Sequence, residues 1–310
     1  MSIEFLPQHQ QEVAQQNIIE LPSGVKLGYI MLNADALNGA MPIVSVNAVL
    51  TDITAPERAY DGVLLAETGR PVLLIDFQGH GIGSRMSRKQ VIDLCWHRDI
   101  TSHVAPVLEA VDILVGKGEK RDYFGVSQGG AIVLKMAAMD KSDSVNKVVG
   151  IEVPATSRRN TLAVQGEYIL RDSVWGGWRY SRQMKDTEKQ TQYEEFRKEH
   201  AKLGIKRADS YIKQDKLFAL WNLAMSINAR PHAAKSLRET IANSNALVSL
   251  ITGSNSHVSS SSAIAQLIED FDEDYTDRFK QTIVQGDHNI GRAERMPEHI
   301  AAAHQFFTRA

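Results

Sequence analysis

The hydrophobic residues of this chain fall into two recurring patterns. Short runs rich in Val, Ile and Leu predict buried strands, because these side chains favour a pleated, packed surface. Longer stretches with apolar residues three and four positions apart predict helices with one buried face. The predicted strands are two around the turn Pro22–Gly24 within 17–33, and then 42–50, 72–75, 123–126, 146–153, 246–252 and 281–285.

The predicted helices alternate with these strands over most of the chain. A chain of this kind is typical of an α/β fold, in which helices cover both faces of a parallel sheet. We therefore expect an α/β protein with a mostly parallel sheet of roughly eight strands and helices on both faces. The predicted helices cover 55–69, 98–116, 131–139, 231–243, 261–271 and 297–307.

Residues 155–230 interrupt the alternation. This stretch contains no run that predicts a strand, and several of its segments have helical spacing. We interpret it as a helical cap inserted into one core domain, which is formed by residues 1–154 and 231–310. The apolar stripes of the cap are expected to pack against neighbouring helices, and Trp175 and Trp178 are candidates for lining a pocket.

Composition narrows the class of protein. The chain has 310 residues, of which 43% are hydrophobic and 23% charged, so it can bury a large core and is not expected to be disordered. A formal net charge of −2 argues against nucleic acid as a partner. The single cysteine, Cys95, excludes an intrachain disulfide and a cysteine-cluster metal site.

The sequence also predicts a location in the cell. Residues 1–16 are polar and lack the basic-then-apolar pattern of a signal peptide. No apolar run approaches the roughly 18 residues of a membrane span. We therefore expect a cytoplasmic protein without a membrane span.

A serine between a predicted strand and a predicted helix is the most informative feature. It lies in Gly125-Val-Ser127-Gln-Gly129, a G-x-S-x-G sequence. The two glycines allow the sharp turn that holds such a serine in a strained backbone. The hydroxyl would then stand at a helix N-terminus, where free N–H groups favour developing negative charge. The alternative interpretation is an ordinary glycine-rich turn.

Together with two other segments and the insertion, this turn resembles the α/β-hydrolase superfamily. Asp76–Ser84 is similar to the family's strand-end segment D-x-x-G-x-G-x-S, Gly125–Gly129 to its nucleophile turn, and Gly286–His288 to the loop with its catalytic histidine. The insertion at 155–230 is similar to its cap domain. The matches occur in the family's order and span nearly the whole chain, but no subfamily is matched closely enough to be named.

The resemblance and the chemistry of the residues imply the same roles. Ser127 would be the nucleophile, and its hydroxyl needs a base because it is a weak nucleophile on its own. His288 is the best candidate for the base, since it lies between the last predicted strand and helix and the family order is serine, acid, histidine. His257 is an alternative base, and His80 is expected to be structural.

The oxyanion of such a reaction needs two backbone N–H donors. Gln128, the residue after the nucleophile, would supply one. By position, Val49 would supply the other, from the loop after the strand that begins at 42. The family often has His-Gly in this loop, whereas this chain has Asn47-Ala48, so the side-chain amide of Asn47 is an alternative donor.

The acid of the triad is harder to assign. The common family position follows the second-last predicted strand, where this chain has Asn255 and Ser256 and no carboxylate. Haloalkane dehalogenases use a second position, at the end of the strand before the cap, where this chain has Glu152. A carboxylate there costs free energy unless it is paired, which favours Glu152, with Asn255 as the fallback. The alternative is a structural carboxylate that pairs with Arg158 or Arg159.

These residues predict a serine hydrolase that cleaves a carboxylic ester, thioester or related acyl bond. We expect no cofactor, no metal, and a small-molecule substrate with an apolar acyl or ring group. Two other classes stay open: an acyltransferase or C–C bond hydrolase with the same residues, and a ligand-binding protein that has lost catalysis. The missing acid after residue 252 and the altered Asn47-Ala48 loop support the last class. The sequence does not specify an oligomeric state.

Overall fold

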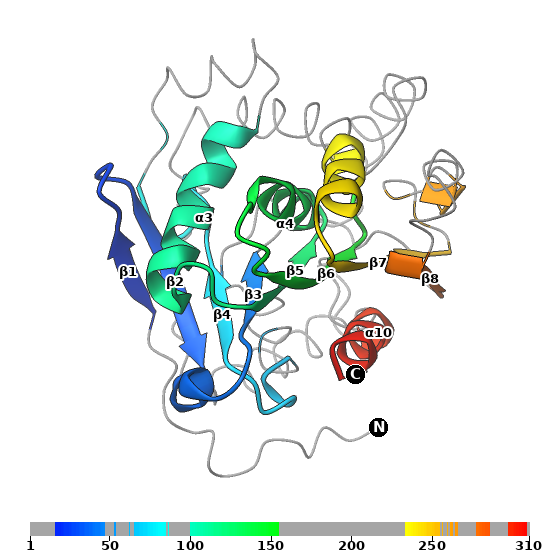
Figure 1. The fold of residues 1–310 in the computed structure, drawn as a ribbon, viewed down its shortest axis with the longest axis horizontal. Helices are drawn as coiled ribbons and strands as arrows, with labels where there is room; N and C mark the ends of the chain where they lie inside the picture. The colour runs from blue at the N-terminus through cyan, green and yellow to red at the C-terminus, as the bar shows by residue number, and fades with distance from the viewer. Residues whose placement is uncertain are drawn as a thin grey trace, which may run out of the picture.

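The structure is a computed structural model of the chain. Within the residues that it describes, the chain forms one sheet with helices packed against it (Figure 1). The predicted cap at 155–230, Val49 and His288 lie outside these residues. The structure describes residues 16–46, 53, 62, 65–84, 86, 100–154, 233–254, 256, 259, 261–262, 264–265, 277–285 and 297–308.

The eight strands of the sheet have the order β1-β2-β4-β3-β5-β6-β7-β8. β2 pairs antiparallel with both β1 and β4, whereas all the other neighbouring strands are parallel. The sheet confirms the predicted eight-stranded, mostly parallel architecture. The strands are β1 Asn17–Glu20, β2 Lys26–Leu32, β3 Ile43–Val46, β4 Val72–Ile75, β5 Arg121–Val126, β6 Val145–Ile151, β7 Leu247–Gly253 and β8 Phe279–Val284.

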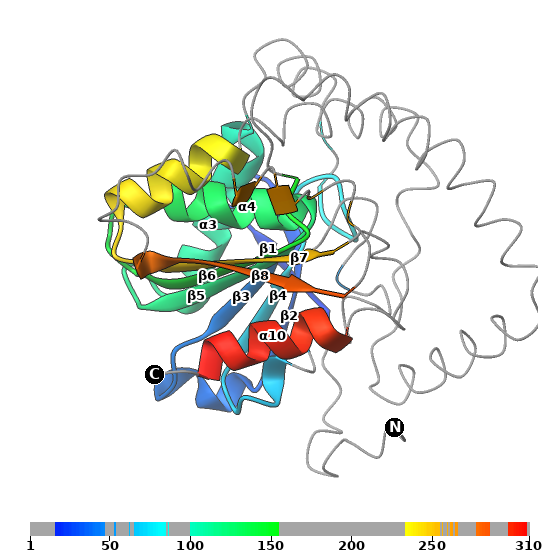
Figure 2. The same cartoon turned by 90° about the vertical axis from the view of Figure 1, so that its right-hand side faces the viewer.

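Helices cover both faces of the sheet, as predicted (Figure 2). The first face carries α3 (Thr101–Val115), α4 (Gln128–Met139) and a helix at 233–243, and the opposite face carries α10 (Pro297–Thr308). A short 3₁₀ helix, η2 (Ala34–Asn38), connects β2 to β3.

Each face has its own hydrophobic core, because successive strand residues point to opposite sides. In β5, Tyr123 joins the core that contains Leu134 of α4, whereas Phe124 joins the core that contains Phe307 of α10. β4 and β5 are buried along their whole length. Strands buried on both faces lack a polar side, which is why the sequence showed apolar runs rather than strict alternation.

The start of α4 differs from the prediction. The helix begins at Gln128, three positions before the predicted start at Ala131. The intervening Gly129 and Gly130 disfavour helix by intrinsic propensity. In the fold the small size of Gly130 is required instead, since a Cβ at Gly130 would lie 2.5 Å from a methyl carbon of Val153. Tertiary packing therefore decides where this helix begins.

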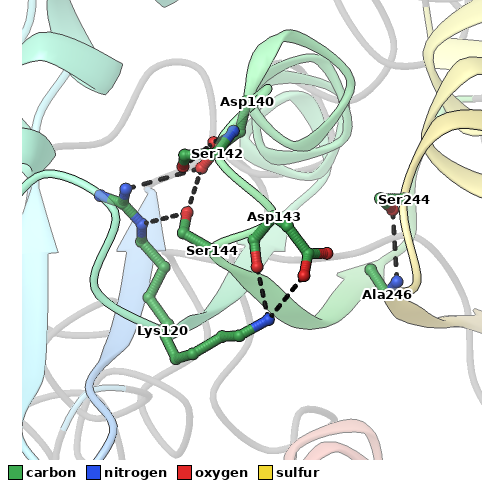
Figure 3. Close-up of polar contacts among 8 residues, drawn as sticks. Lys120, Asp140, Ser142, Asp143, Ser144, Ser244 and Ala246 are labelled. Atoms are coloured by element: carbon green, nitrogen blue, oxygen red, sulfur yellow. Dashed lines mark hydrogen bonds and ion pairs between the residues drawn. The ribbon is translucent and has the colours of Figure 1, made fainter.

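The amino-terminal ends of β5 and β6 carry a buried charge network (Figure 3). Arg121, which is 1% exposed, donates to Ser144 Oγ at 3.1 Å. Its guanidinium also pairs with Asp112 at 2.8 Å and Asp140 at 3.5 Å. Burial raises the pKa of Asp140, but hydrogen bonds from neighbouring serines and the charge of Arg121 outweigh burial and leave the pKa below its usual value. This network lies at the opposite end of β5 from the serine turn.

A second buried carboxylate, Asp122, lies at the same end of the sheet. It accepts hydrogen bonds from Arg70 at 2.7 Å and from Asn146 at 2.8 Å. Its backbone N–H donates to the carbonyl of Pro42 at 2.9 Å. Because these partners come from the starts of β3, β4 and β6, Asp122 ties four neighbouring strands together at their amino ends.

Candidate active site

Residues at the ends of three adjacent strands lie side by side at the carboxyl edge of the sheet. Ser127 follows β5, Glu152 follows β6, and Gly253 ends β7. The Ser127 N–H donates to the carbonyl of Ile151 at 2.7 Å, and the Glu152 N–H donates to the carbonyl of Ile251 at 2.8 Å. The hydrogen-bonded ladder thus extends to both residues at the edge where ligands of parallel α/β sheets bind.

Ser127 occupies a strained turn between β5 and α4. Its φ of 53° and ψ of −117° lie in a region that residues other than glycine rarely adopt. A Cβ at Gly125 would come within 2.4 Å of the backbone of Gly129, so only glycine allows the turn to close at position 125. Strain of this kind clusters at functional sites, and this turn is the sharp strand-to-helix connection predicted from the sequence.

α4 begins directly after Ser127, so Gln128 is its first residue. The first N–H groups of a helix have no partner within the helix, and they favour negative charge. The Gln128 side chain is 3% exposed, and within the described part of the chain neither its Oε1 nor its Nε2 has a hydrogen-bond partner. The backbone of Gln128 can therefore serve an oxyanion, while its side chain makes no hydrogen bond within the described residues that would contribute to stability.

Glu152 is a buried carboxylate with an unusual backbone. Its φ is 52° and the residue is 1% exposed. Oε1 accepts the N–H of Gly253 and lies 3.2 Å from His299 Nε2, and Oε2 accepts the hydroxyl of Ser256. The Ser256 hydroxyl accepts the N–H of Ser259 at 3.0 Å, which orients it. These donors offset the free-energy cost of burying a charged group.

The contact of Glu152 with His299 was not predicted from the sequence. His299 lies in the first turn of α10 and is buried together with Ile300, Ala303 and Phe307 on the side that faces the sheet. A histidine within the apolar stripe of the last helix was the signal, and it was visible in the sequence. Apolar patterning alone did not reveal what this histidine contacts, because Glu152 lies 147 positions earlier in the chain.

Several predicted site residues lie outside the described residues. They are Asn47, Val49, Arg158, Arg159, Asn255, His257 and His288. Their roles, and the partner of Glu152 in a triad, stay predictions. Among the described residues, no three His, Cys, Asp or Glu side chains are grouped so that they could hold a metal. No helix in the described ranges is both long enough and apolar enough to cross a membrane.

The Asp76–Ser84 segment forms a turn anchored to neighbouring strands. Asp76 is buried, and its Oδ1 accepts the N–H of Ile53 at 3.0 Å. At the other end, the Ser84 N–H donates to Lys26 O at 2.6 Å, and Ser84 Oγ accepts the Lys26 N–H at 2.7 Å. Between them His80 is 1% exposed, with its ring centroid 3.9 Å from that of Phe77. These contacts give the segment a structural role beside β4.

Comparison with known proteins identifies the fold. The sequence matches no protein-family model and no curated protein. Solved structures similar to it include an esterase from Exiguobacterium antarcticum (TM-score 0.61, 13% identity, 95% of this chain and 100% of that one). A second is an enol-lactonase from Burkholderia xenovorans LB400 (TM-score 0.59, 17% identity, 94% of this chain and 100% of that one). A third is an α/β hydrolase fold protein from Chitinophaga pinensis (TM-score 0.60, 15% identity, 97% of this chain and 99% of that one).

These likenesses extend over nearly the whole chain, and at such low identities they establish the fold. Together with the antiparallel β2 and the crossover order β2-β4-β3-β5, they show that the chain has the α/β-hydrolase fold. The fold that the resemblance implied is therefore confirmed.

We expect His80 to make the protein less stable in acid. Burial lowers the pKa of His80 to about 3, and nearby His103 adds to this effect. The unfolded chain would bind a proton on this ring below about pH 6.5, whereas the folded chain would do so only near its lower pKa. The free energy of unfolding should therefore fall by about 1.4 kcal/mol per unit as the pH drops through this interval.

Urea unfolding from about pH 7.5 to about pH 4 measures this slope. His80→Gln should flatten it, and His304→Gln, which removes a half-buried histidine on α10, serves as the control. A His80→Gln curve parallel to the wild-type curve would contradict the prediction.

We expect Gln128→Met to leave the protein as stable as the wild type or more so. The substitution keeps the volume and the backbone N–H while removing a buried amide that has no hydrogen-bond partner among the described residues. Removing such a group relieves a desolvation cost of about 1–3 kcal/mol. Thermal unfolding of Gln128→Met and of the smaller Gln128→Ala distinguishes this effect from a cavity. A loss above about 1 kcal/mol in Gln128→Met would show that the amide is hydrogen-bonded in the folded protein.

Proposed function

We propose that this chain is a serine hydrolase that cleaves a carboxylic ester, thioester or related acyl bond. Ser127 is the nucleophile, His288 the general base and Glu152 the acid. The observation that carries the proposal is the left-handed backbone of Ser127, directly before α4 and one strand away from the buried Glu152. An esterase and an enol-lactonase among the similar structures support ester-type chemistry.

The proposed reaction has two halves. His288 accepts the proton of Ser127 while the serine oxygen bonds to the acyl carbon, and the backbone N–H groups of Gln128 and Val49 donate to the resulting oxyanion. His288 then gives the proton to the leaving alcohol or thiol as its bond to the acyl carbon breaks. Water then attacks the acyl carbon and loses a proton to His288, and His288 gives this proton to the serine oxygen as its bond to the acyl carbon breaks, which releases the carboxylic acid and regenerates Ser127 and the neutral base.

Glu152 holds the imidazole of His288 in the correct tautomer and stabilises the imidazolium as it forms. Its own orientation supports this role, because Gly253 and Ser256 donate to different oxygens of the carboxylate. Asn255, the fallback, carries no charge and would stabilise an imidazolium less. Glu152 therefore serves as the acid from the end of β6.

The substrate is proposed to be a small molecule with an apolar acyl or ring group. Residues 155–230 would form the lid that selects it, since pocket walls set discrimination between substrates while the triad sets the chemistry. A ligand-binding protein without catalysis would have no need to keep the strained backbone at Ser127. An acyltransferase or a C–C bond hydrolase would use the same residues, and product analysis distinguishes them from an esterase.

Ser127→Ala should reduce ester hydrolysis by roughly 10⁴- to 10⁶-fold and abolish covalent labelling by a fluorophosphonate. The protein should stay folded, because the hydroxyl is not part of the close backbone packing at Gly125. Hydrolysis of esters of several chain lengths and mass spectrometry of the labelled protein measure these effects. If the alanine variant kept half of the wild-type activity on every ester, Ser127 would not be the nucleophile.

Glu152→Gln should lower kcat by about 10⁴-fold, by analogy with an acid-to-amide change in a serine protease triad. Asp122→Asn is the matched control, because Asp122 is equally buried but lies at the amino ends of the strands with Arg70. It should lower the melting temperature and leave kcat within a few-fold of wild type. Near-normal turnover in Glu152→Gln would exclude Glu152 as the acid.

A further inference from the structure

α10 extends along the sheet from the carboxyl ends of the parallel strands to their amino ends. Near its C-terminus, Phe307 lies under the Arg70 guanidinium, 5.9 Å from the ring centroid, close to the amino end of β4. In its first turn, His299 Nε2 lies 3.2 Å from Glu152 Oε1 at the carboxyl edge. The helix therefore runs antiparallel to the parallel strands, and its N-terminal turn reaches the candidate active site from the face opposite α4 (Figure 2).

We propose that His299 is a positioning residue for the acid Glu152. The inference rests on the proposed function, in which Glu152 orients the base. A carboxylate can only accept, so His299 Nε2 must carry the proton and donate it to Oε1. The three donors described for Glu152 are thus the N–H of Gly253 in β7, the hydroxyl of Ser256 in the segment after β7, and His299 in α10.

The three donors stabilise the charge of Glu152 and also restrict the orientation of its carboxylate. A glutamate side chain has three rotatable bonds, and ordering it costs up to about 2 kcal/mol of conformational entropy. Gly253 and Ser256 both approach from the β7 side, whereas His299 approaches from α10. The carboxylate is therefore held between two elements of the fold, so that its plane is fixed relative to the sheet.

In the proposed mechanism, the His299 contact would affect catalysis by fixing the position of Glu152. Misplacement of a reacting or orienting group by about 1 Å can cost roughly 10²-fold in rate. Losing a hydrogen-bonding partner behind a functional group commonly costs about 10–100-fold, as it does for the outer partners of metal ligands. The loss should fall on kcat rather than KM, because Glu152 acts through the base and does not select the substrate.

The experiment compares His299→Phe with His299→Gln. Phenylalanine fills the ring volume without a donor, whereas glutamine keeps an N–H donor of similar reach. We expect His299→Phe to lower kcat by about 10–100-fold with KM unchanged, and His299→Gln to recover most of the loss. His304→Phe, later on the same helix, is the control and should leave kcat unchanged. If His299→Phe does not fold, His299→Asn, which is too short to reach Oε1, replaces it.

Each other outcome overturns the proposal in a distinct way. A lower melting temperature with wild-type kcat in both variants would make His299 structural only. Loss of turnover and of fluorophosphonate labelling in both variants, with an active His288→Ala enzyme, would make His299 the base instead. Failure of the proposed function is separate, because it would appear as unlabelled wild-type protein or as an active Ser127→Ala variant.

Discussion

Close packing of α4 against β5 is the constraint on which the rest of the site depends. At Gly125 backbone meets backbone, and no side chain fits between β5 and Gly129. The chain can enter α4 only through a turn as tight as the one at Ser127. The same approach places Val153 against Gly130 and Gly150, where added Cβ atoms would lie 2.5 Å and 2.4 Å from its methyl carbon. Because Val153 follows Glu152 directly, this packing also constrains the backbone at Glu152.

Buried carboxylates have different kinds of partner at the amino ends and at the carboxyl ends of the parallel strands. At the amino edge, Asp122 and Asp140 face the guanidinium groups of Arg70 and Arg121, which compensate their charges. At the carboxyl edge, the donors described for Glu152 are a backbone N–H, a hydroxyl and an imidazole. The described contacts of these carboxylates therefore differ in kind: guanidinium ion pairs at the amino edge, and hydrogen bonds from the backbone, a hydroxyl and a ring nitrogen at the carboxyl edge.

Most of the architecture could be predicted from the sequence because the strands are short apolar runs bounded by turn residues. β4 was predicted at its observed limits, and Ser127 was recognised because glycines on both sides of a serine are typical of a tight strand-to-helix turn. Local propensity failed at Gly129 and Gly130, where tertiary contact outweighs the low helix propensity of glycine. The partners of Glu152 and Arg121 could not be found in this way, since contacts between residues distant in the chain leave no local period. Glu152 was chosen as the acid because haloalkane dehalogenases use this position and because a charge at the end of a buried strand needs compensating partners. The structure shows such partners, and the catalytic role stays a prediction.

The strand order also constrains how the molecule assembles. β3 pairs with β4 and β5 and does not pair with β2, the strand before it in the chain, because β4 lies between them. Of the described strand pairs, β1 and β2 can form a local hairpin. In contrast, pairing of Ile43 in β3 with Asp122 in β5 joins residues separated by a long stretch of chain that includes β4 and α3. Pairing of this kind incurs the entropy of loop closure before the contacts compensate for it, which slows folding. Until β5 arrives, one edge of β3 stays unpaired, so the strand that becomes the middle of the finished sheet is, during folding, an edge open to aggregation.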